Sequence, residues 1–348
     1  GFDEQSFDES HHARAVATHI GSRHTARTFR GDMFGETLDQ VRGFLDEPFA
    51  DASILPTHFL SKTVKEEGVT VVLSGDGADE LFAGYPTYYA QQVAEKIKGV
   101  PGSGRLFRAA ARGLAHLPSS YENVTPDYVA RRFVAGGPLS PPERQATFLG
   151  AFLKDELPSI LAPDALSTMD PDAPFGELIA HHAHAKANGG NFLDRLTYQD
   201  LRTYMGDDIL VKVDRASMAT SLEVRTPFLD HRLVEMAARM PPHLKLNGRE
   251  GKYILKRAIK PRLPHRVIDR KKKGFGLPIA KWLHGPWREL LQDTLGNGRA
   301  ETSGLLSQRA VDTLIAEHLS GKRDRRRPLW SLLMFQWWYE VPFGPGAK

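Results

Sequence analysis

The sequence predicts an α/β fold in which an open parallel sheet is joined to a large, mostly helical part. The apolar segment GVTVVLS at 68–74 is typical of a strand buried on both faces of a parallel sheet. Helical and strand-like periods alternate before it, as they do in open α/β sheets. Beyond about residue 90 the apolar spacing becomes mainly helical. We therefore expect one domain over 1–348, with an α/β part over 1–100 and a mainly helical part over 101–348.

The elements before this strand follow from the local spacing. A helix begins near Asp8-Glu9-Ser10, places Val16 and Ile20 on one face, and can end at Gly21. The segment HTARTFR at 24–30 alternates between polar and apolar residues, which predicts a strand.

Two more helices are expected before the strand at 68–74, and three after it. A helical stripe runs from Leu38 to Leu45, and a helix over 56–67 begins at a proline and stops before a glycine. The later helices include 192–205, 253–260 and the Trp-rich 328–340. Because large aromatic residues are usually buried, we expect 328–340 to dock in a core rather than to form an aromatic binding site.

The composition excludes several classes of protein. Of the 348 residues, 41% are hydrophobic and 25% are charged, which is ordinary for a globular chain. The chain has no cysteine, so it has no disulfide framework, thiolate zinc site or cysteine nucleophile. No apolar run reaches the roughly 18 residues that a membrane span needs, and the acidic start is unlike a signal peptide. We expect a cytoplasmic protein that does not contact membranes.

The net charge of +4 is small, but basic residues cluster in RKKKGFG at 270–276 and KRDRRR at 322–327. Charge runs are usually solvated surface, and this interpretation is favoured for 322–327. The alternative is a patch that binds phosphate or nucleic acid. The loop at 270–276 combines three lysines with two glycines and could close over a polyphosphate.

The segment SGDGADE at 74–80 follows the predicted strand, where ligands bind in open α/β sheets. Gly75 and Gly77 permit a tight turn and a close approach of the backbone to a ligand. Asp79 lies in the first turn of the next helix and can hold Mg²⁺, which takes one or two carboxylates plus phosphate oxygens. Equally, Asp79 or Glu80 could merely stabilise the helix dipole.

A second charged segment, DDILVKVDRASMATSLEVRTPFLDHRLVE, covers 207–235. Asp208, Lys212 and Arg215 differ by three or four residues, which places them on one side of a helix. They could face a ligand. A network of ion pairs within the chain is an equally good explanation.

Taken together, these segments resemble the synthetase domain of the glutamine-dependent asparagine synthetases. The family pattern S-G-x-G-x-D-E-L-F-x-G-Y is matched at 74–85, and V-D-R-A-S-M followed by L-E-V-R-x-P-F-L-D is matched at 213–230. The pattern R-K-K-K-G-F-G-x-P is matched at 270–278. GFDEQSFDES at the start and DEPFADASILPT at 46–57 also resemble the family.

The resemblance implies a sheet of the adenine-nucleotide α-hydrolase-like (PP-loop ATPase) type and a nucleotide-binding role for residues 1–100. It implies an ATP- and Mg²⁺-dependent ligase that converts aspartate to asparagine. Aspartate would be activated as an aspartyl-adenylate, and ammonia derived from glutamine would then attack the acyl carbon. The resemblance predicts no nucleic-acid partner, and a homodimer is a further expectation.

The resemblance also assigns residues. Lys272 corresponds to the family's catalytic lysine, which acts on the α-phosphate and the adenylate, and Asp79 to the Mg²⁺ ligand. Asp76 is expected to be catalytic, although some members carry glutamate there and aspartate is one methylene shorter. The remaining expected contacts to nucleotide, pyrophosphate or substrate are Ser74, Gly75, Gly77, Lys212 and Arg215.

Two features depart from the family pattern. Without cysteine, the chain cannot perform the chemistry of the family's N-terminal glutaminase domain. The S-G-G-x-D-S loop that grips pyrophosphate also does not occur. We therefore expect a chain truncated before Gly1, with the glutaminase domain and the pyrophosphate-loop strand upstream in the intact protein. By itself such a chain would be inactive, and its strand at 69–73 would lack a partner on one side.

Three alternatives stay open from the sequence. One is a related amidotransferase that amidates a sugar, peptide or antibiotic precursor. Another is a tRNA-modifying adenylating enzyme of similar fold. The third is a non-catalytic fragment that acts as a binding partner.

Overall fold

The computed structural model describes residues 1–117, 119–170, 172–270, 274 and 276–340. It divides into two compact units, each assembled from three chain segments. Unit 1 comprises Gly1–Met33, Ser53–Val93 and Ala180–Gly276, and unit 2 comprises Phe34–Ala52, Ala94–Ile179 and the chain from Leu277 onward. Both units combine residues from before and after position 100, and the domain boundary expected there stays a prediction.

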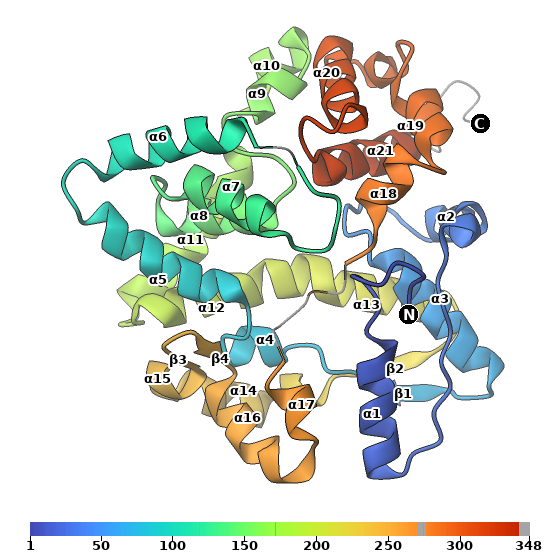
Figure 1. The fold of residues 1–348 in the computed structure, drawn as a ribbon, viewed down its shortest axis with the longest axis vertical. Coiled ribbons are helices and arrows are strands. Elements are labelled where there is room, and N and C mark those ends of the chain that lie inside the picture. Colours follow the sequence, from blue (N-terminus) through green and yellow to red (C-terminus); the bar gives the residue numbers. More distant parts are fainter. Residues whose placement is uncertain (118, 171, 271–273, 275, 341–348) are drawn as a thin grey trace. The chain divides into compact units, whose positions relative to one another are not determined.

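Unit 1 contains the short strands and about half of the helices (Figure 1). Its elements are α1 (Ser10–Ile20), η1 (Gly31–Met33), α3 (Ile54–Glu66), β1 (Val71–Leu73), α4 (Ala78–Leu81), α12 (Phe192–Arg202), the π-helix η2 (Tyr204–Ile209), α13 (Leu210–Met218), β2 (Glu223–Arg225), η3 (Pro227–Leu229), α14 (His231–Ala238), α15 (Pro242–Lys245), β3 (Leu246–Asn247), β4 (Glu250–Gly251), α16 (Tyr253–Ile259), η4 (Lys260–Arg262) and α17 (His265–Ile268).

Unit 2 is helical, apart from an isolated bridge between Leu161 and Leu306. Its elements are α2 (Phe34–Arg42), α6 (Ser103–Ala115), α7 (Pro126–Gly136), α8 (Pro141–Leu149), α9 (Leu157–Ile160), α10 (Pro163–Thr168), α18 (Ile279–His284), α19 (Arg288–Leu295), η5 (Ala300–Ser303), α20 (Gln308–Leu319) and α21 (Arg326–Glu340). Two helices, α5 (Pro86–Lys98) and α11 (Ala173–Ala187), cross from one unit to the other.

The main sheet in the described residues is a parallel pair, β1 and β2. Val71 pairs with Glu223 and Leu73 with Arg225, and α13 packs against both β2 and α3. Figure 1 shows the pair in unit 1. Parallel pairing agrees with the predicted fold class, and the chain has a mostly helical α/β fold with a small parallel sheet. The wider PP-loop sheet stays a prediction.

Strand β1 is less covered than the sequence predicts. Burial on both faces was expected from its continuous apolar run, but Leu73 is 72% exposed and Val71 is 40% exposed. The reason is that, within the described residues, one strand pairs with β1 and no layer covers the Leu73 side chain.

Local signals placed several elements well. Helix α1 begins after Asp8, whose carboxylate accepts a hydrogen bond from the Ser10 amide at 3.1 Å, and it ends at Gly21 with φ of 69°. The strand predicted at 24–30 is wrong. In this segment Phe29 is buried and its amide donates to the Gly1 carbonyl at 2.9 Å, but no regular ladder forms.

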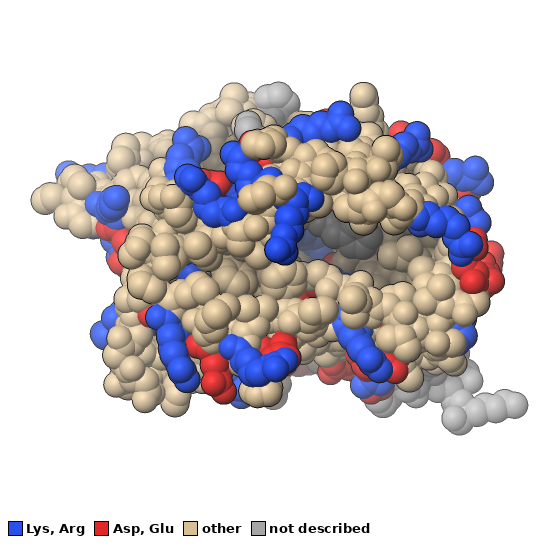
Figure 2. Space-filling view, turned by 90° about the horizontal axis from the view of Figure 1, so that it is seen from below, with Lys and Arg blue, Asp and Glu red and all other residues tan. Residues whose placement is uncertain are grey.

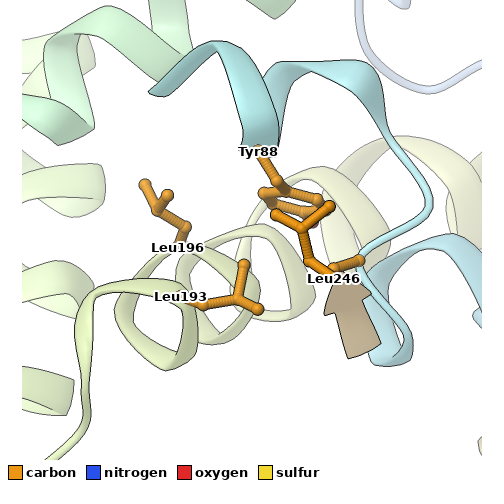
Figure 3. Close-up of a cluster of buried hydrophobic side chains, with 5 residues drawn as sticks. Tyr88, Leu193, Leu196 and Leu246 are labelled. Carbon is orange, nitrogen blue, oxygen red and sulfur yellow. The ribbon is translucent and has the colours of Figure 1, made fainter. Parts of the chain in front are cut away.

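The core of unit 1 joins residues that lie far apart in the sequence. Tyr88 of α5 packs against Leu193 and Leu196 of α12 and Leu246 of β3, with Ala83 completing the cluster (Figure 3). Each of these side chains is at most 7% exposed. This cluster fixes the start of α5, and therefore the segment that follows the SGDGADE loop, on the body of unit 1.

The core of unit 2 is aromatic. Trp330 and Trp337 of α21 each lie 6.0 Å from the ring of Phe34, which also contacts Trp287 at 3.6 Å between ring centroids. All four side chains are buried. The expectation that 328–340 is a docked helix rather than an exposed aromatic site is therefore confirmed.

None of the described helices is both long and apolar enough to cross a membrane. Basic and acidic side chains alternate over the face seen from below in Figure 2, as the small net charge leads one to expect.

Candidate active site

The loop after β1 is held at both of its ends by hydrogen bonds. The Ser74 amide donates to the Arg225 carbonyl at 2.8 Å and so continues the pairing of β1 with β2. The Ser74 hydroxyl donates to Oδ2 of Asp76 at 2.7 Å. Ser74 and Asp76, both predicted site residues, thus form one half-buried polar pair at the carboxyl end of the strand.

The two glycines of the loop differ in what they require. Gly77 has φ of 93°, and a Cβ there would lie 2.5 Å from Cδ2 of Leu229, so the turn needs glycine for both conformation and space. Gly75 is exposed, and a Cβ there would meet nothing within 4 Å. The tight turn is confirmed at Gly77, and a close approach of ligand to Gly75 stays a prediction.

The carboxylate of Asp79 pairs with the ammonium of Lys252, with 2.9 Å between Lys252 Nζ and Asp79 Oδ1. The two side chains are 23% and 15% exposed, for Lys252 and Asp79 respectively, so the pair is partly buried but reachable. Lys252 immediately precedes α16. Sequence reasoning missed it, although it is the nearest described cation to the predicted metal ligand.

The backbone around this ion pair is unusually constrained. Lys252 has φ of 54° and Ala83 has φ of 53°, a region that residues other than glycine rarely adopt. A Cβ on Gly84 would lie 2.0 Å from Oδ1 of Asp79, and one on Gly251 would lie 2.2 Å from the Ala83 carbonyl oxygen. Conformations of this kind persist where surrounding structure enforces them, and they concentrate at functional sites.

Beneath the ion pair, Glu80 is almost fully buried and accepts a hydrogen bond from the Tyr85 hydroxyl. Burial raises the pKa of Glu80, since removal from water disfavours the carboxylate, while the Tyr85 hydrogen bond opposes this. Burial also raises the pKa of Tyr85, and the neighbouring charge of Glu80 raises it further. Tyr85 therefore stays a neutral donor that holds Glu80 in place.

A second buried pair supports the first. The Tyr88 hydroxyl donates to Oδ2 of Asp200 at 2.7 Å, and both residues are fully buried. The Tyr85 ring also lies 5.8 Å from that of Tyr204 in the π-helix. Through these contacts the SGDGADE segment is anchored to α12 and to the π-helix, an element that often occurs at functional sites.

Helix α4 begins after Gly77 but is only four residues long, from Ala78 to Leu81. Its first turn carries both Asp79 and Glu80. So short a helix has a weak dipole, and an anion at its start would face acidic side chains. The described geometry therefore favours a bound cation over an anion at Asp79.

The second charged segment divides between two kinds of helix. Asp208 lies in the π-helix, whereas Lys212 and Arg215 lie in α13, which packs against α3 and leads into β2. Asp208 and Lys212 are half-buried and Arg215 is exposed. Since β2 pairs with β1, both predicted segments contribute a strand to the same sheet of unit 1, but Lys212 and Arg215 precede β2, so their place at the site stays a prediction.

Known proteins match nearly the whole length of this chain. The asparagine synthase family matches residues 1–340. The chain belongs to the asparagine synthase family.

A glutamine-hydrolysing asparagine synthetase of Mycobacterium tuberculosis is 35% identical over 98% of this chain and 50% of its own length. Asparagine synthetase 1 of Bacillus subtilis is 27% identical over 98% of this chain and 51% of its own. More distantly, amidase chry2 of Gibberella zeae is 24% identical over 89% of this chain. The chain thus spans about half the length of the curated relatives it matches.

Within this family the lysine-rich loop at 270–276 is expected to be catalytic. Lys272 lies outside the described residues, so its predicted place opposite Asp79 stays a prediction. Its described neighbour Arg270 forms an ion pair with Glu9. That pair ties the start of the loop to the region just before α1 within unit 1.

The other basic run, 322–327, lies in unit 2, where at least two of its arginines have partners from the same unit. Arg325 pairs with Glu156 at 2.5 Å and with Glu317 at 2.7 Å, and its side chain is 13% exposed. Arg327 donates to the Leu149 carbonyl at 2.8 Å, at the C-terminal end of α8. The expectation of a solvated surface run is wrong for these two residues, because neighbouring carboxylates and helix carbonyls take up their charge.

Among the described residues, no three His, Asp or Glu side chains form a preassembled metal cluster. A single half-buried carboxylate is nevertheless what Mg²⁺ needs when phosphate oxygens supply the other ligands. Asp79 meets that requirement, and its role as a metal ligand remains a proposal.

Proposed function

We propose that this chain carries the active site of an ATP-dependent, amide-forming ligase that converts aspartate to asparagine. The observation that supports this most is the partly exposed Asp79–Lys252 pair at the carboxyl end of β1, in a chain whose family match extends over residues 1–340. Ligands of open α/β sheets bind at that edge.

The proposed reaction has two balanced steps. A side-chain carboxylate oxygen of aspartate attacks the α-phosphorus of ATP, the bond to the bridging oxygen breaks, and pyrophosphate leaves. The lone pair of ammonia then attacks the acyl carbon, the bond to AMP breaks, and the nitrogen loses a proton to give the amide. The first step moves negative charge onto pyrophosphate, so cations must be placed where that charge develops.

The described cation that pairs with the proposed metal ligand Asp79 is Lys252. Its ammonium is held by Asp79 and its backbone amide donates to the Phe82 carbonyl at 2.8 Å, so its position is fixed before any ligand arrives. We assign Lys252 to the phosphates beside Lys272, which the family pattern places against the α-phosphate. Lys212 and Arg215 are assigned to pyrophosphate or to the substrate's other carboxylate.

On the other side of the site, Ser74, Gly75, Asp76 and Gly77 are proposed to line the pocket for aspartate and nucleotide. The Ser74–Asp76 hydrogen bond orients the Asp76 carboxylate, which can then accept from the substrate's ammonium group. Mg²⁺, when bound at Asp79, would neutralise charge on the phosphate oxygens. Asp79 would then serve both the metal and Lys252.

The partners follow from the same proposal. Aspartate and ATP are the substrates, and the nitrogen comes from ammonia that a glutaminase domain releases from glutamine. We also propose a cytoplasmic homodimer without a nucleic-acid partner.

A related amidotransferase acting on another carboxylate is the second candidate. Two observations favour keeping it: Asp76 is shorter than the glutamate of some family members, and proteins named as amidases occur among the relatives. The shorter side chain leaves more room at the acyl substrate.

One assay separates the candidates. The protein as its gene encodes it is supplied with ATP, Mg²⁺, ammonium and one carboxylate at a time, and both pyrophosphate and the amide are measured. Equal amounts of pyrophosphate and asparagine, dependent on aspartate, are expected. Turnover with a different carboxylate would favour the second candidate, and release of ADP instead of AMP would contradict both.

A further inference from the structure

Unit 2 contains a pocket that is separate from the proposed ligase residues. It has a volume of about 210 Å³ and lies among α6, α7 and the chain that leads into α21. We call it the α6–α7 pocket and define it by Ala111, Leu114, Tyr128, Arg131, Arg132 and Arg325. All of these residues belong to unit 2.

The charged lining of the α6–α7 pocket is dominated by guanidinium groups. Four arginines and three carboxylates line it: Arg131, Arg132, Arg323 and Arg325 against Asp127, Glu156 and Asp324. Two of the carboxylates are already engaged, Glu156 by Arg325 and Asp324 by Arg326. The lining therefore has one more positive charge than negative charge.

Arg131 is the guanidinium with unused donors. Its Nη2 donates to the Leu117 carbonyl, whereas its Nε is buried and has no hydrogen-bond partner among the described residues. Buried donors are almost always paired, and an unpaired donor on a charged group is costly. The Nε atom itself is covered by protein, so an acceptor in the pocket would remove that cost only once the Arg131 side chain turns toward it.

The neighbouring Arg132 adds positive charge, and the carboxylate that acts on it, Glu156, is already paired with Arg325. It donates to the carbonyls of Thr147 at 2.9 Å and Ala151 at 3.0 Å. Burial lowers the pKa of Arg132, since the charged form loses contact with water. A bound anion would offset this loss.

Apart from Ser119 and Tyr128, the rest of the lining is apolar and consists of Ala111, Leu114, Ala115, Val134, Ala135, Ala151, Leu153 and Pro328. The volume is below the range of about 300–1,000 Å³ that is typical of pockets for drug-sized ligands. The pocket therefore suits a small ligand with an anionic end and an apolar body.

We propose that the α6–α7 pocket binds a small monocarboxylate with a short apolar body, anchored by the guanidinium of Arg131. The guanidinium fork matches a carboxylate in shape, with Nε as one of the donors. The single excess charge suits a monoanion better than a phosphate ester, which carries nearly two charges. The Asp127 carboxylate, also in the lining, would repel the more highly charged group more strongly.

Titration calorimetry on the full 348-residue chain tests this, with benzoate as the probe and benzamide as its neutral counterpart of the same shape. Benzoate is expected to bind at one site, at least about tenfold more tightly than benzamide, because a hydrogen bond to a charged group is worth more than a neutral one. Ionic strength is held constant with chloride. Equal affinities for the two probes, or no benzoate binding at millimolar concentration, would overturn the proposal.

Matched variants locate the site. Arg131→Met should weaken benzoate binding about tenfold or more, Arg131→Lys should restore part of it, and Arg105→Met, which removes an exposed arginine of α6, should change nothing. Asp127→Asn should tighten binding severalfold, because it removes a like charge. Wild-type affinity in a folded Arg131→Met chain, or unchanged affinity in Asp127→Asn, would refute the assignment.

Discussion

Two charged regions of this chain look alike in sequence and differ in structure. In unit 1, Asp79 and Lys252 form a partly exposed pair beside a loop that ends a strand. In unit 2, Arg325 and Arg327 are bound by two carboxylates and by the end of α8. Both regions are dense in charge, but in the second region Arg325 and Arg327 already have their own partners within unit 2.

The difference lies in what surrounds each charge. Arg325 finds partners on two other elements, so its ion pairs connect parts of unit 2 and contribute to stability. Around Lys252, strained backbone and the close approach of Gly84 and Gly251 hold the Asp79–Lys252 pair in place. The charged groups of the proposed active site therefore differ from those of unit 2 in two ways: the backbone holds them in a strained position, and they are partly exposed. We expect removal of charge to reduce activity in the first region and stability in the second.

The largest effect is expected for Asp79→Asn. Loss of the carboxylate removes both the proposed metal ligand and the partner of Lys252, so pyrophosphate release should fall by at least about 10³-fold. The fold should persist, since the pair is partly exposed. Asp32→Asn, at an exposed carboxylate of unit 1, is the control and should retain full activity. Near-normal turnover in Asp79→Asn would exclude the metal assignment.

The next effect concerns Lys272, for which the family pattern gives the register. Lys272→Ala should lower kcat by about 10²–10³ and change KM for ATP less, because its charge acts on the transition state. Steady-state kinetics with Lys271→Ala and Lys273→Ala test the register. If one of those variants is severe while Lys272→Ala is silent, the motif is aligned one position off.

In unit 2 the expected effect is on stability. Arg325→Met removes the partner of Glu156 and the closer of two partners of Glu317, and should lower the free energy of unfolding by about 2 kcal/mol. Arg323→Met, in the same run but 43% exposed and 3.8 Å from Glu317, should cost close to nothing. Urea unfolding measures both. A large loss of activity per folded molecule in Arg325→Met would contradict the division of roles between the two regions.

The smallest effect is a pH dependence from His318, which is fully buried in unit 2. Its Nε2 lies 3.2 Å from the Ala280 carbonyl and its Nδ1 accepts from the Arg325 amide at 3.3 Å, which requires the neutral ring. Burial lowers the pKa of His318 to about 4. The unfolded chain therefore binds an extra proton between about pH 6.5 and pH 4, and stability falls as the pH drops through that window.

The slope from this group should be about 1 kcal/mol per pH unit. The measurement is thermal or urea unfolding at pH 6.5 and 5.5, compared with His318→Gln, which can make both hydrogen bonds without titrating. The difference between the two proteins should shrink at the lower pH. A pH-independent difference would show that the pKa of His318 is the same in the folded and unfolded chains, and would contradict this prediction.

Much of the fold could be predicted because local signals were sufficient. The boundaries of α1 and the end of α3 follow from an acidic start and a following glycine, which act within a single turn, whereas α3 begins at Ile54, two residues before the predicted proline. The strand at 24–30 was wrong because alternation alone cannot supply a pairing partner. The exposed Leu73 has the same origin, since how far a strand is covered depends on distant residues.

The sequence predicted the residues of the SGDGADE segment but not the lysine that pairs with them. The glycine and acid pattern identified Asp79 and the turn at Gly77, because these depend on neighbouring residues. Lys252 was missed because 173 positions separate it from Asp79 and no local pattern links the two. The local feature that could have indicated Lys252 is the pair Gly251-Lys252 directly before the predicted helix at 253–260.

Gly84 has a consequence for how this gene tolerates change. Because a Cβ there would lie 2.0 Å from Oδ1 of Asp79 and 2.4 Å from Cε of Lys252, the obstacle is the first side-chain atom itself. In a saturation library, even alanine at position 84 should therefore be depleted, because it must displace the Asp79–Lys252 pair. At Gly75, where a Cβ meets no protein atom within 4 Å, tolerance should instead decline gradually with side-chain size. The two substitution profiles would distinguish a glycine that neighbouring side chains of the chain require from a glycine that leaves space for a ligand.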